Sequence, residues 1–171
     1  MSKKINAKSL TTAAMLTAMS IIIGIFCKNF LNFGGGLFRI TFENLPIILS
    51  GILFGPVVGG IVGCATDLIS YLLSSQIYPP NLIVTLGVVT IGVISGIVSR
   101  CTKEGRGRII LSCTLSHLIG SVIIKSAGLF IFYGWAILWR IPLYAVIATV
   151  ETVLLCLLYK NNNFKSLMDK L

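Results

Sequence analysis

The stretch from Phe38 to Leu73 is apolar, and a glycine stands at every fourth position from Gly51 to Gly63. A spacing of four places these glycines along one side of a helix, where a missing side chain lets a second backbone approach closely. Close approach of this kind is typical of helix packing inside a lipid bilayer, because burial of apolar surface does not drive helices together there. We therefore predict that closely packed membrane helices form the centre of this chain.

The composition of the whole chain supports a membrane protein. Of its 171 residues, 56% are hydrophobic and only 11% are charged, and the mean hydropathy is +0.96. Apolar runs near the length of a bilayer span recur along it, which predicts a single integral membrane domain. The net charge of +9 comes mostly from short polar segments between these runs. Such charges indicate membrane topology and do not suggest a nucleic-acid partner.

The pair Gly55-Pro56 interrupts the central run. Proline fits the first turn of a new helix and disfavours helical geometry in the residue before it. Two helices joined by a tight turn are therefore the prediction, and a single bent helix is the alternative.

The predicted fold is an all-α bundle of six transmembrane helices in a single domain. These helices are expected at residues 8–30, 42–54, 56–73, 81–99, 109–133 and 142–159. Six spans would place ten of the fourteen basic residues on one side: Lys3, Lys4 and Lys8 at the start of the chain, four between the fourth and fifth spans, and three lysines of the tail. The positive-inside rule makes that side, and with it both termini, cytoplasmic.

Catalytic and cofactor motifs are missing from the sequence. It contains no phosphate-binding GxxxxGK[ST], no HExxH and no GxSxG, and its five cysteines include no CxxC pair. With one histidine as well, we expect no metal, no cofactor and no enzyme activity. Six spans without a recognisable internal repeat are also few for a complete secondary transporter. A binding subunit that uses an energised partner explains these absences, while a small stand-alone carrier and a membrane enzyme are the alternatives.

One segment carries a family resemblance. The run LPIILSGILFGPVVGGIVGCATDLISYLL, with Arg39-Ile40-Thr41-Phe42 before it and Tyr78-Pro79-Pro80 after it, resembles the second and third helices of S components of energy-coupling factor (ECF) transporters. It looks most like the folate-specific branch, although IYPPN departs from that branch by lacking an aromatic residue between tyrosine and proline and a glycine beyond.

The resemblance implies a bacterial cell-membrane subunit that captures folate from outside. Its implied partners are a transmembrane T component and two ATPases, which supply the energy for uptake. It also implies that Ala14 and Ala18, an AxxxA step on the first helix, dock on the T component. Taken alone, such a step is more typical of packing within one chain. An S component for another flat anionic vitamin remains an alternative.

Four ionisable residues are expected inside or at the mouth of the membrane: Asp67, Lys125, Arg140 and Glu151. Such groups are costly to insert, so each of them suggests function. Arg140, Tyr144 and Glu151 form one stripe on the last helix, which suits a ligand with an anionic end and an amide-like end. We expect Lys125, Arg140 and Arg39 to bind the carboxylates of folate. Glu151, or alternatively Asp67, would accept hydrogen bonds from its pterin.

Aromatic residues gather on the predicted outer side and could wall a pocket for flat rings. The predicted substrate-binding residues are Phe38, Arg39, Asp67, Tyr71, Tyr78, Pro80, Lys125, Trp139, Arg140, Tyr144 and Glu151. Mutual neutralisation of Lys125 and Glu151 is the structural alternative for that pair. His117 is expected to be a packed, hydrogen-bonded helix residue. The segments 34–36 and 74–81 are expected to gate the site.

Overall fold

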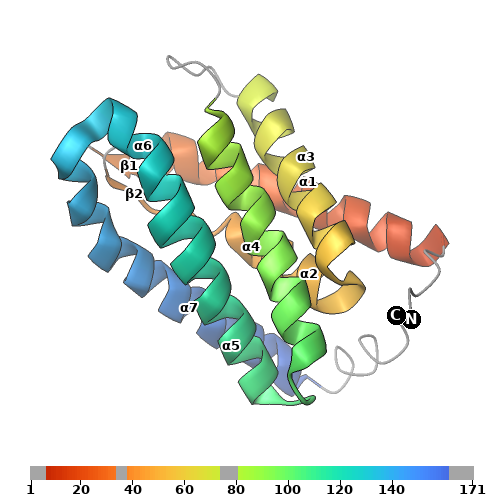
Figure 1. The fold of residues 1–171 in the computed structure, drawn as a ribbon. Helices are drawn as coiled ribbons and strands as arrows, with labels where there is room; N and C mark the ends of the chain where they lie inside the picture. The colour runs from red at the N-terminus through yellow and green to blue at the C-terminus, as the bar shows by residue number, and fades with distance from the viewer. Residues whose placement is uncertain (1–6, 34–37, 74–80, 162–171) are drawn as a thin grey trace.

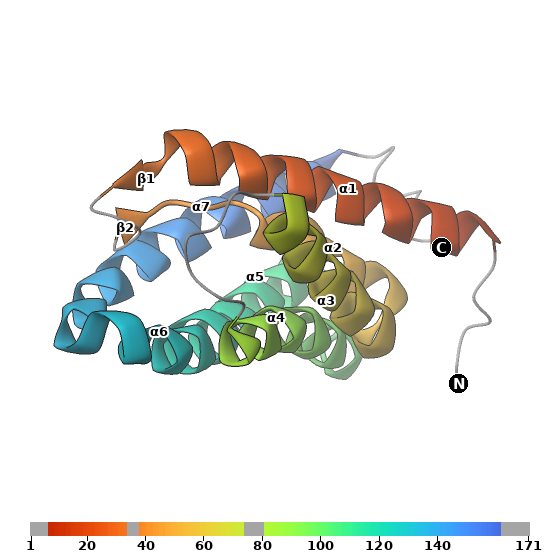
Figure 2. The same cartoon turned by 90° about the horizontal axis from the view of Figure 1, so that it is seen from above.

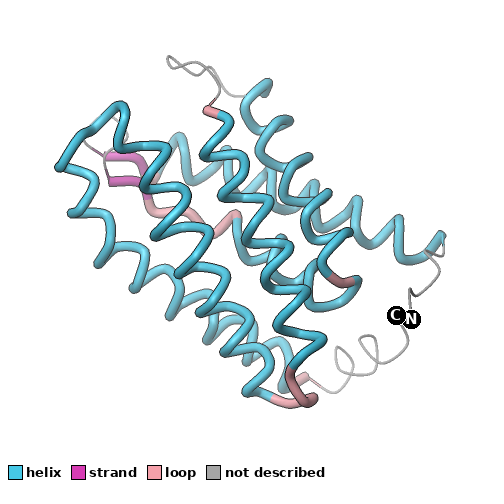
Figure 3. Tube along the Cα trace, in the orientation of Figure 1, coloured by secondary structure: helices cyan, strands magenta, loops and turns pink. Residues whose placement is uncertain are grey.

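The computed structural model describes residues 7–33, 38–73 and 81–161, and nearly all of them are helical (Figures 1 and 3). Tyr78, Pro80 and almost all of the two predicted gate segments lie outside these ranges. The elements are α1 (Ala7–Phe30), β1 (Asn32–Phe33), β2 (Phe38–Arg39), α2 (Asn44–Phe54), α3 (Pro56–Leu73), α4 (Leu82–Cys101), α5 (Arg106–Ser116), the π-helix η1 (His117–Lys125), α6 (Ser126–Tyr133), the 3₁₀-helix η2 (Gly134–Trp139) and α7 (Arg140–Lys160).

Four helical segments within the described ranges are long and apolar enough to cross a membrane. These are α1, α3, α4 and the continuous stretch Arg106–Lys160, whereas α2 is apolar but shorter. The stretch Arg106–Lys160 turns back on itself near η2, so that α7 runs beside α5 and η1 (Figure 1). The described part of the protein is therefore nearly all helical and has four to five candidate membrane helices. The number of six spans and their orientation in the membrane remain predictions.

The chain forms two helices at Gly55-Pro56, as this pair predicts. α2 ends at Phe54 and α3 begins at Pro56. Gly55 between them has φ 95°, a conformation that glycine adopts without steric cost, and its N–H donates to the carbonyl of Gly51. The turn is therefore tight enough to lay α2 and α3 against each other.

The glycines form the expected packing seam. A Cβ atom on Gly59 would collide with the carbonyl of Gly92, and one on Gly92 would collide with the carbonyl of Gly59. Gly51 likewise faces Gly92 and Ser95, while Gly96 faces the start of α3. The α2–α3 pair therefore packs on α4 backbone to backbone, which is the arrangement that small residues permit in lipid.

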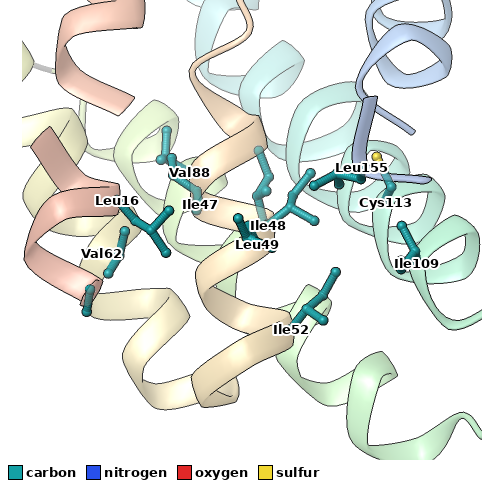
Figure 4. Packing of buried hydrophobic residues seen from close by; sticks show 12 residues of the cluster. Leu16, Ile47, Ile48, Leu49, Ile52, Val62, Val88, Ile109, Cys113 and Leu155 are labelled. Atoms are coloured by element: carbon teal, nitrogen blue, oxygen red, sulfur yellow. The ribbon is translucent and has the colours of Figure 1, made fainter. Parts of the chain in front are cut away.

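The short helix α2 is the centre of the core (Figure 4). Ile47 and Ile48 have no exposed surface. Side chains from all the surrounding helices pack around them, among them Leu16, Val62, Val88, Cys113 and Leu155. Figure 2 shows α1 along one side of the molecule and α4 with α5 and α6 along the other.

Different structural features lie near the two ends of α2. At its C-terminal end, Arg108 donates from Nη2 to the carbonyl of Ile52 at 3.0 Å and from Nε to Ser99 at 2.8 Å. Towards the other end of the bundle, β1 and β2 pair antiparallel with Asn32 opposite Arg39. Basic residues of the α4–α5 connection and the residues near β2 therefore lie at opposite ends of the bundle.

The predicted fifth helix, 109–133, contains an irregularity that the sequence did not indicate. Its middle nine residues, His117–Lys125, form the π-helix η1. π-helical turns are rare, and they occur frequently at functional sites. His117, Ser121 and Lys125 stand four residues apart in it, and all three are buried. The wider helix thus directs a row of polar side chains into the bundle.

Candidate functional site

Arg39 and Glu43 form an ion pair where β2 leads into α2. The Nη2 atom of Arg39 lies 3.1 and 3.2 Å from the two carboxylate oxygens of Glu43. Glu43 is buried, and Ser20 of α1 donates a hydrogen bond to its backbone carbonyl. Arg39 is a predicted ligand-binding residue, whereas no role was predicted for Glu43. The signal was present, since an acidic residue at the edge of an apolar run needs a cation.

Lys125, at the end of η1, is buried beside this pair. Only 6% of its surface is exposed, and its Nζ donates to Oδ1 of Asn44 at 3.0 Å. Glu43 and Asp67 also attract its charge. Two of the predicted ligand-binding cations are thus held by the adjacent residues Glu43 and Asn44, where α2 begins.

Arg140 is the first residue of α7, and it is also buried. Its guanidinium carbon lies 5.5 Å from the ring centroid of Tyr144. The Nε atoms of Arg140 and Arg39 are buried and have no hydrogen-bond partner among the described residues. Buried N–H groups are nearly always bonded. These two donors are therefore suited to an acceptor that the described residues do not supply.

Asp67 joins α3 to α4. Its carboxylate accepts a 2.6 Å hydrogen bond from Thr85, and Lys28 and Lys125 attract its charge. Tyr71 follows one turn later on α3 and is half-buried. Asp67 therefore belongs to the same electrostatic neighbourhood as Lys125, although its nearest described partner is a hydroxyl.

Glu151 is the deepest polar residue of the predicted stripe. It is fully buried, and its Oε2 lies 2.7 Å from Nε2 of His117, while Oε1 has no partner among the described residues. The other ring nitrogen of His117 lies 3.3 Å from the hydroxyl of Ser121. Glu151 and Lys125 therefore have different hydrogen-bond partners, which differs from the mutual neutralisation considered above. His117 is packed and hydrogen-bonded, as expected.

Cys113, His117 and Glu151 together offer ligand types that zinc binds. One candidate ligand atom of each lies within 4.8 Å of the others, and all three are buried. Two ligands of one tetrahedral zinc ion stand roughly 3.3 Å apart, given metal–ligand bonds of about 2.0 Å. The 2.7 Å between His117 and Glu151 is instead the length of a charge-assisted hydrogen bond. The geometry favours a proton between them over a metal ion.

The remaining predicted residues are dispersed. Phe38 and Trp139 are 39% and 71% exposed, and the structure does not bring them into the buried cluster. Ala14 and Ala18 are exposed on α1, and they face away from Leu16 and Ser20, which point into the bundle. Their predicted roles in binding and docking are not tested by these positions.

Three comparisons place the chain among known proteins. The model of the ECF transporter substrate-specific component family matches residues 8–168. The chain is 27% identical over 121 residues to the folate transporter FolT of Clostridium novyi, covering 70% of this chain and 69% of that protein. It is 31% identical over 103 residues to the uncharacterized MG098 homolog of Mycoplasma pneumoniae, covering 55% of this chain but only 21% of that protein.

Its fold is similar to a crystal structure of FolT bound with folic acid, with a TM-score of 0.62 and 23% sequence identity, covering 90% of this chain and 89% of that one. The family prediction is confirmed, because the family model spans almost the whole sequence. The chain belongs to the substrate-specific components of ECF transporters, which are multi-pass proteins of the bacterial cell membrane.

Proposed function

We propose that this chain is the high-affinity folate-capture subunit of an ECF importer. In this proposal, residues 1–171 form one domain of six membrane spans with both termini in the cytoplasm. The chain has no catalytic role, and it delivers folate through a T component and two ATPases. The six-span arrangement is supported by the basic α4–α5 connection, which lies at the end of the bundle opposite β1 and β2.

One observation carries the choice of ligand class. Arg39, Lys125 and Arg140 are gathered at one end of the bundle, and two of them hold a buried N–H donor without a described partner. A buried cation is costly unless an anion compensates it. The carboxylates of folate are suited to this role, and FolT of Clostridium novyi is a relative of the chain over most of its length.

The orientation follows from the depth of the polar groups on α7. Arg140 begins α7 and Glu151 lies three turns further along it. We place the glutamate of folate at Arg39, Lys125 and Arg140, and the pterin deeper, towards Glu151. His117 occupies one oxygen of Glu151, and the other oxygen remains able to accept from the amino and N–H groups of the pterin. Asp67 is the second candidate for this acceptor.

The exposed face of α1 is the proposed docking surface for the T component. Ala14 and Ala18 are exposed there, and Leu10, Met15 and Ile22 beside them are each at least 65% exposed. Small residues on an apolar face allow a partner helix to approach closely.

A vitamin panel tests the ligand. The purified chain should show a large rise in melting temperature with folate and little change with uncharged or cationic vitamins. No shift with folate, but a shift with another flat anionic vitamin, would redirect the ligand and keep the subunit class. Robust folate uptake by vesicles that contain the chain without ATPases would instead establish a stand-alone carrier and overturn the proposal.

A further inference from the structure

The carboxylate of Glu43 contacts both Arg39 and the backbone of α1. Nη2 of Arg39 lies 3.1 and 3.2 Å from its two oxygens. The same carboxylate packs on Gly24, because a Cβ atom built on Gly24 would lie only 2.6 Å from Oε2 of Glu43. Ser20, one turn earlier on α1, donates from its hydroxyl to the backbone carbonyl of Glu43. Helix α1 therefore holds the backbone of Glu43 and leaves room for its side chain.

Helix formation does not account for the glycine at position 24. Gly24 lies well inside α1, where glycine is less favourable than alanine, and it does not have a positive φ that would require glycine. Outside its own turn of α1, the three heavy atoms nearest to a Cβ built on Gly24 all belong to Glu43. The space at Gly24 thus serves this one side chain.

Glu43 stands at the N-cap position of α2, but its side chain makes no capping hydrogen bond. A side-chain oxygen at this position commonly accepts from the first free N–H groups of the helix. Here the carboxylate is directed to Arg39 instead. The ion pair leaves one donor over, because Nε of Arg39 is buried and has no partner among the described residues. Glu43 therefore fixes a guanidinium that still has a buried N–H to offer.

We infer that Glu43 is a positioning residue, which holds the guanidinium of Arg39 in the orientation that binds the glutamate of folate, and that Gly24 supplies the space for its carboxylate. The inference rests on the proposed function, because it concerns a cation that would bind this end of the ligand. Glu43 acts through Arg39 and need not touch the ligand. A side chain that is held in its binding orientation beforehand loses less conformational freedom when the ligand binds, so affinity rises.

Two variants move the carboxylate and keep its charge. In Gly24→Ala the new Cβ meets the far end of the Glu43 side chain, so the carboxylate can shift while the helix backbones stay in place. Glu43→Asp shortens the side chain by one methylene group and draws the carboxylate back from Arg39. Because the charge is unchanged in both variants, any effect on the ligand comes from the position of the carboxylate.

Gly92→Ala is the matched control. It is the same exchange at another buried helix glycine, but its new Cβ collides with the backbone carbonyl of Gly59. A backbone carbonyl cannot turn aside as a carboxylate can. The control should therefore lower the melting temperature and leave ligand preference unchanged, whereas Gly24→Ala should change ligand preference at a melting temperature near that of wild type.

Folic acid and pteroic acid, which lacks the glutamate, measure the preference. We define the glutamate preference as the dissociation constant of pteroic acid divided by that of folic acid. Gly24→Ala and Glu43→Asp should each lower it by about tenfold, which about 1.4 kcal/mol produces and which is close to the effect of one hydrogen bond to a charged group. Gly92→Ala should leave it within about twofold of wild type.

Two double variants show whether Gly24 acts through Glu43 and Arg39. In Glu43→Ala the oxygen that would meet the new Cβ is absent, and in Arg39→Gln no guanidinium remains to be positioned. Addition of Gly24→Ala to either variant should therefore change the glutamate preference by no more than about twofold. Each double variant is compared with its own single variant, so that the effect of the removed charge cancels.

The outcomes separate the inference from the proposed function. The inference is overturned if Gly24→Ala and Glu43→Asp keep the wild-type preference or weaken both ligands by the same factor. It is also overturned if Gly24→Ala still lowers the preference about tenfold in the Arg39→Gln background, because Gly24 would then act independently of Arg39. Glu43→Asp decides the matter if Gly24→Ala does not fold. Failure of wild type to bind either pterin overturns the proposed function instead.

Discussion

Nε2 of His117 and Oε2 of Glu151 lie 2.7 Å apart between η1 and α7, and both side chains are almost completely buried. Removing one member of a buried charged pair leaves the other uncompensated, which typically costs about 3–5 kcal/mol. His117→Ala should therefore lower the free energy of unfolding by about this amount. Exchange of both residues for apolar ones of similar volume, His117→Leu with Glu151→Met, should cost much less. Unfolding in detergent measures both variants, and equal losses would show that the pair does not act as a unit.

Lys125 should bind the glutamate end of the ligand. Lys125→Ala is expected to weaken folate binding strongly, because a carboxylate of the ligand is then left without its charged partner. Pteroic acid, which lacks the glutamate, should lose much less affinity in the same variant. Calorimetric titration of the two ligands against wild type and Lys125→Ala gives the comparison. A loss of the same size for both ligands would mean that Lys125 contacts the pterin half.

Glu151 should accept from the pterin. A methyl group on the pterin amino nitrogen removes one donor and adds bulk, so it should weaken binding to wild type more than binding to Glu151→Gln. The reason is that the amide has one acceptor oxygen in place of two. Asp67→Asn is the comparison variant, because Asp67 is the other candidate acceptor. If only Asp67→Asn loses its sensitivity to the methyl group, Asp67 and not Glu151 binds the pterin.

Ala14 and Ala18 should be required for folate uptake by the complete transporter but not for folate binding by this subunit. Ala14→Trp or Ala18→Trp is expected to abolish folate uptake by the complete transporter, since a large side chain blocks close approach of a partner helix. The affinity of the isolated subunit should stay near that of wild type. Ala145→Trp, at an exposed alanine of α7, is the control and should transport normally. Loss of folate binding in the α1 variants would identify the AxxxA step as internal packing.

Because α3 and α4 pack backbone to backbone at their glycines, a single added methyl group at this contact should destabilise the protein. Gly92→Ala should lower the free energy of unfolding by about 1–3 kcal/mol, because the new Cβ collides with the carbonyl of Gly59. Gly107→Ala is the control, because no atom lies within 4 Å of a Cβ built there. Melting temperatures of the two variants test this. A Gly92→Ala protein as stable as the control would mean that α3 and α4 separate easily.

Helix periodicity and proline chemistry were enough to predict most of the helices. The break at Gly55-Pro56 and the packing of Gly59 against Gly92 both follow from local rules that act over a few residues. The π-helix at His117–Lys125 was not predictable in this way, because its pattern of apolar residues resembles that of an ordinary helix. Its effect appears only in three dimensions, where it directs His117 towards Glu151.

For the candidate site, too, the sequence indicates features within one helix but not contacts between distant residues. The stripe of Arg140, Tyr144 and Glu151 was visible because the three residues share one helix, and all of them are buried. The partners of Lys125 and Glu151 lie 81 and 34 positions away, and spacing carries no information about such pairs. The roles in ligand binding that we assign to these side chains remain predictions.

Arg108 also bears on how the orientation of this protein in the membrane can be tested. Its guanidinium donates to the carbonyl of Ile52, in the last turn of α2, where carbonyls have no partner within the helix. Neutralising basic residues one by one is a common way to probe which loops are cytoplasmic, and it assumes that each residue contributes only charge. That assumption suits the exposed Lys103 and Arg106. At Arg108 the same substitution also removes the cap of α2, so a change in orientation could not be distinguished there from damage to the core.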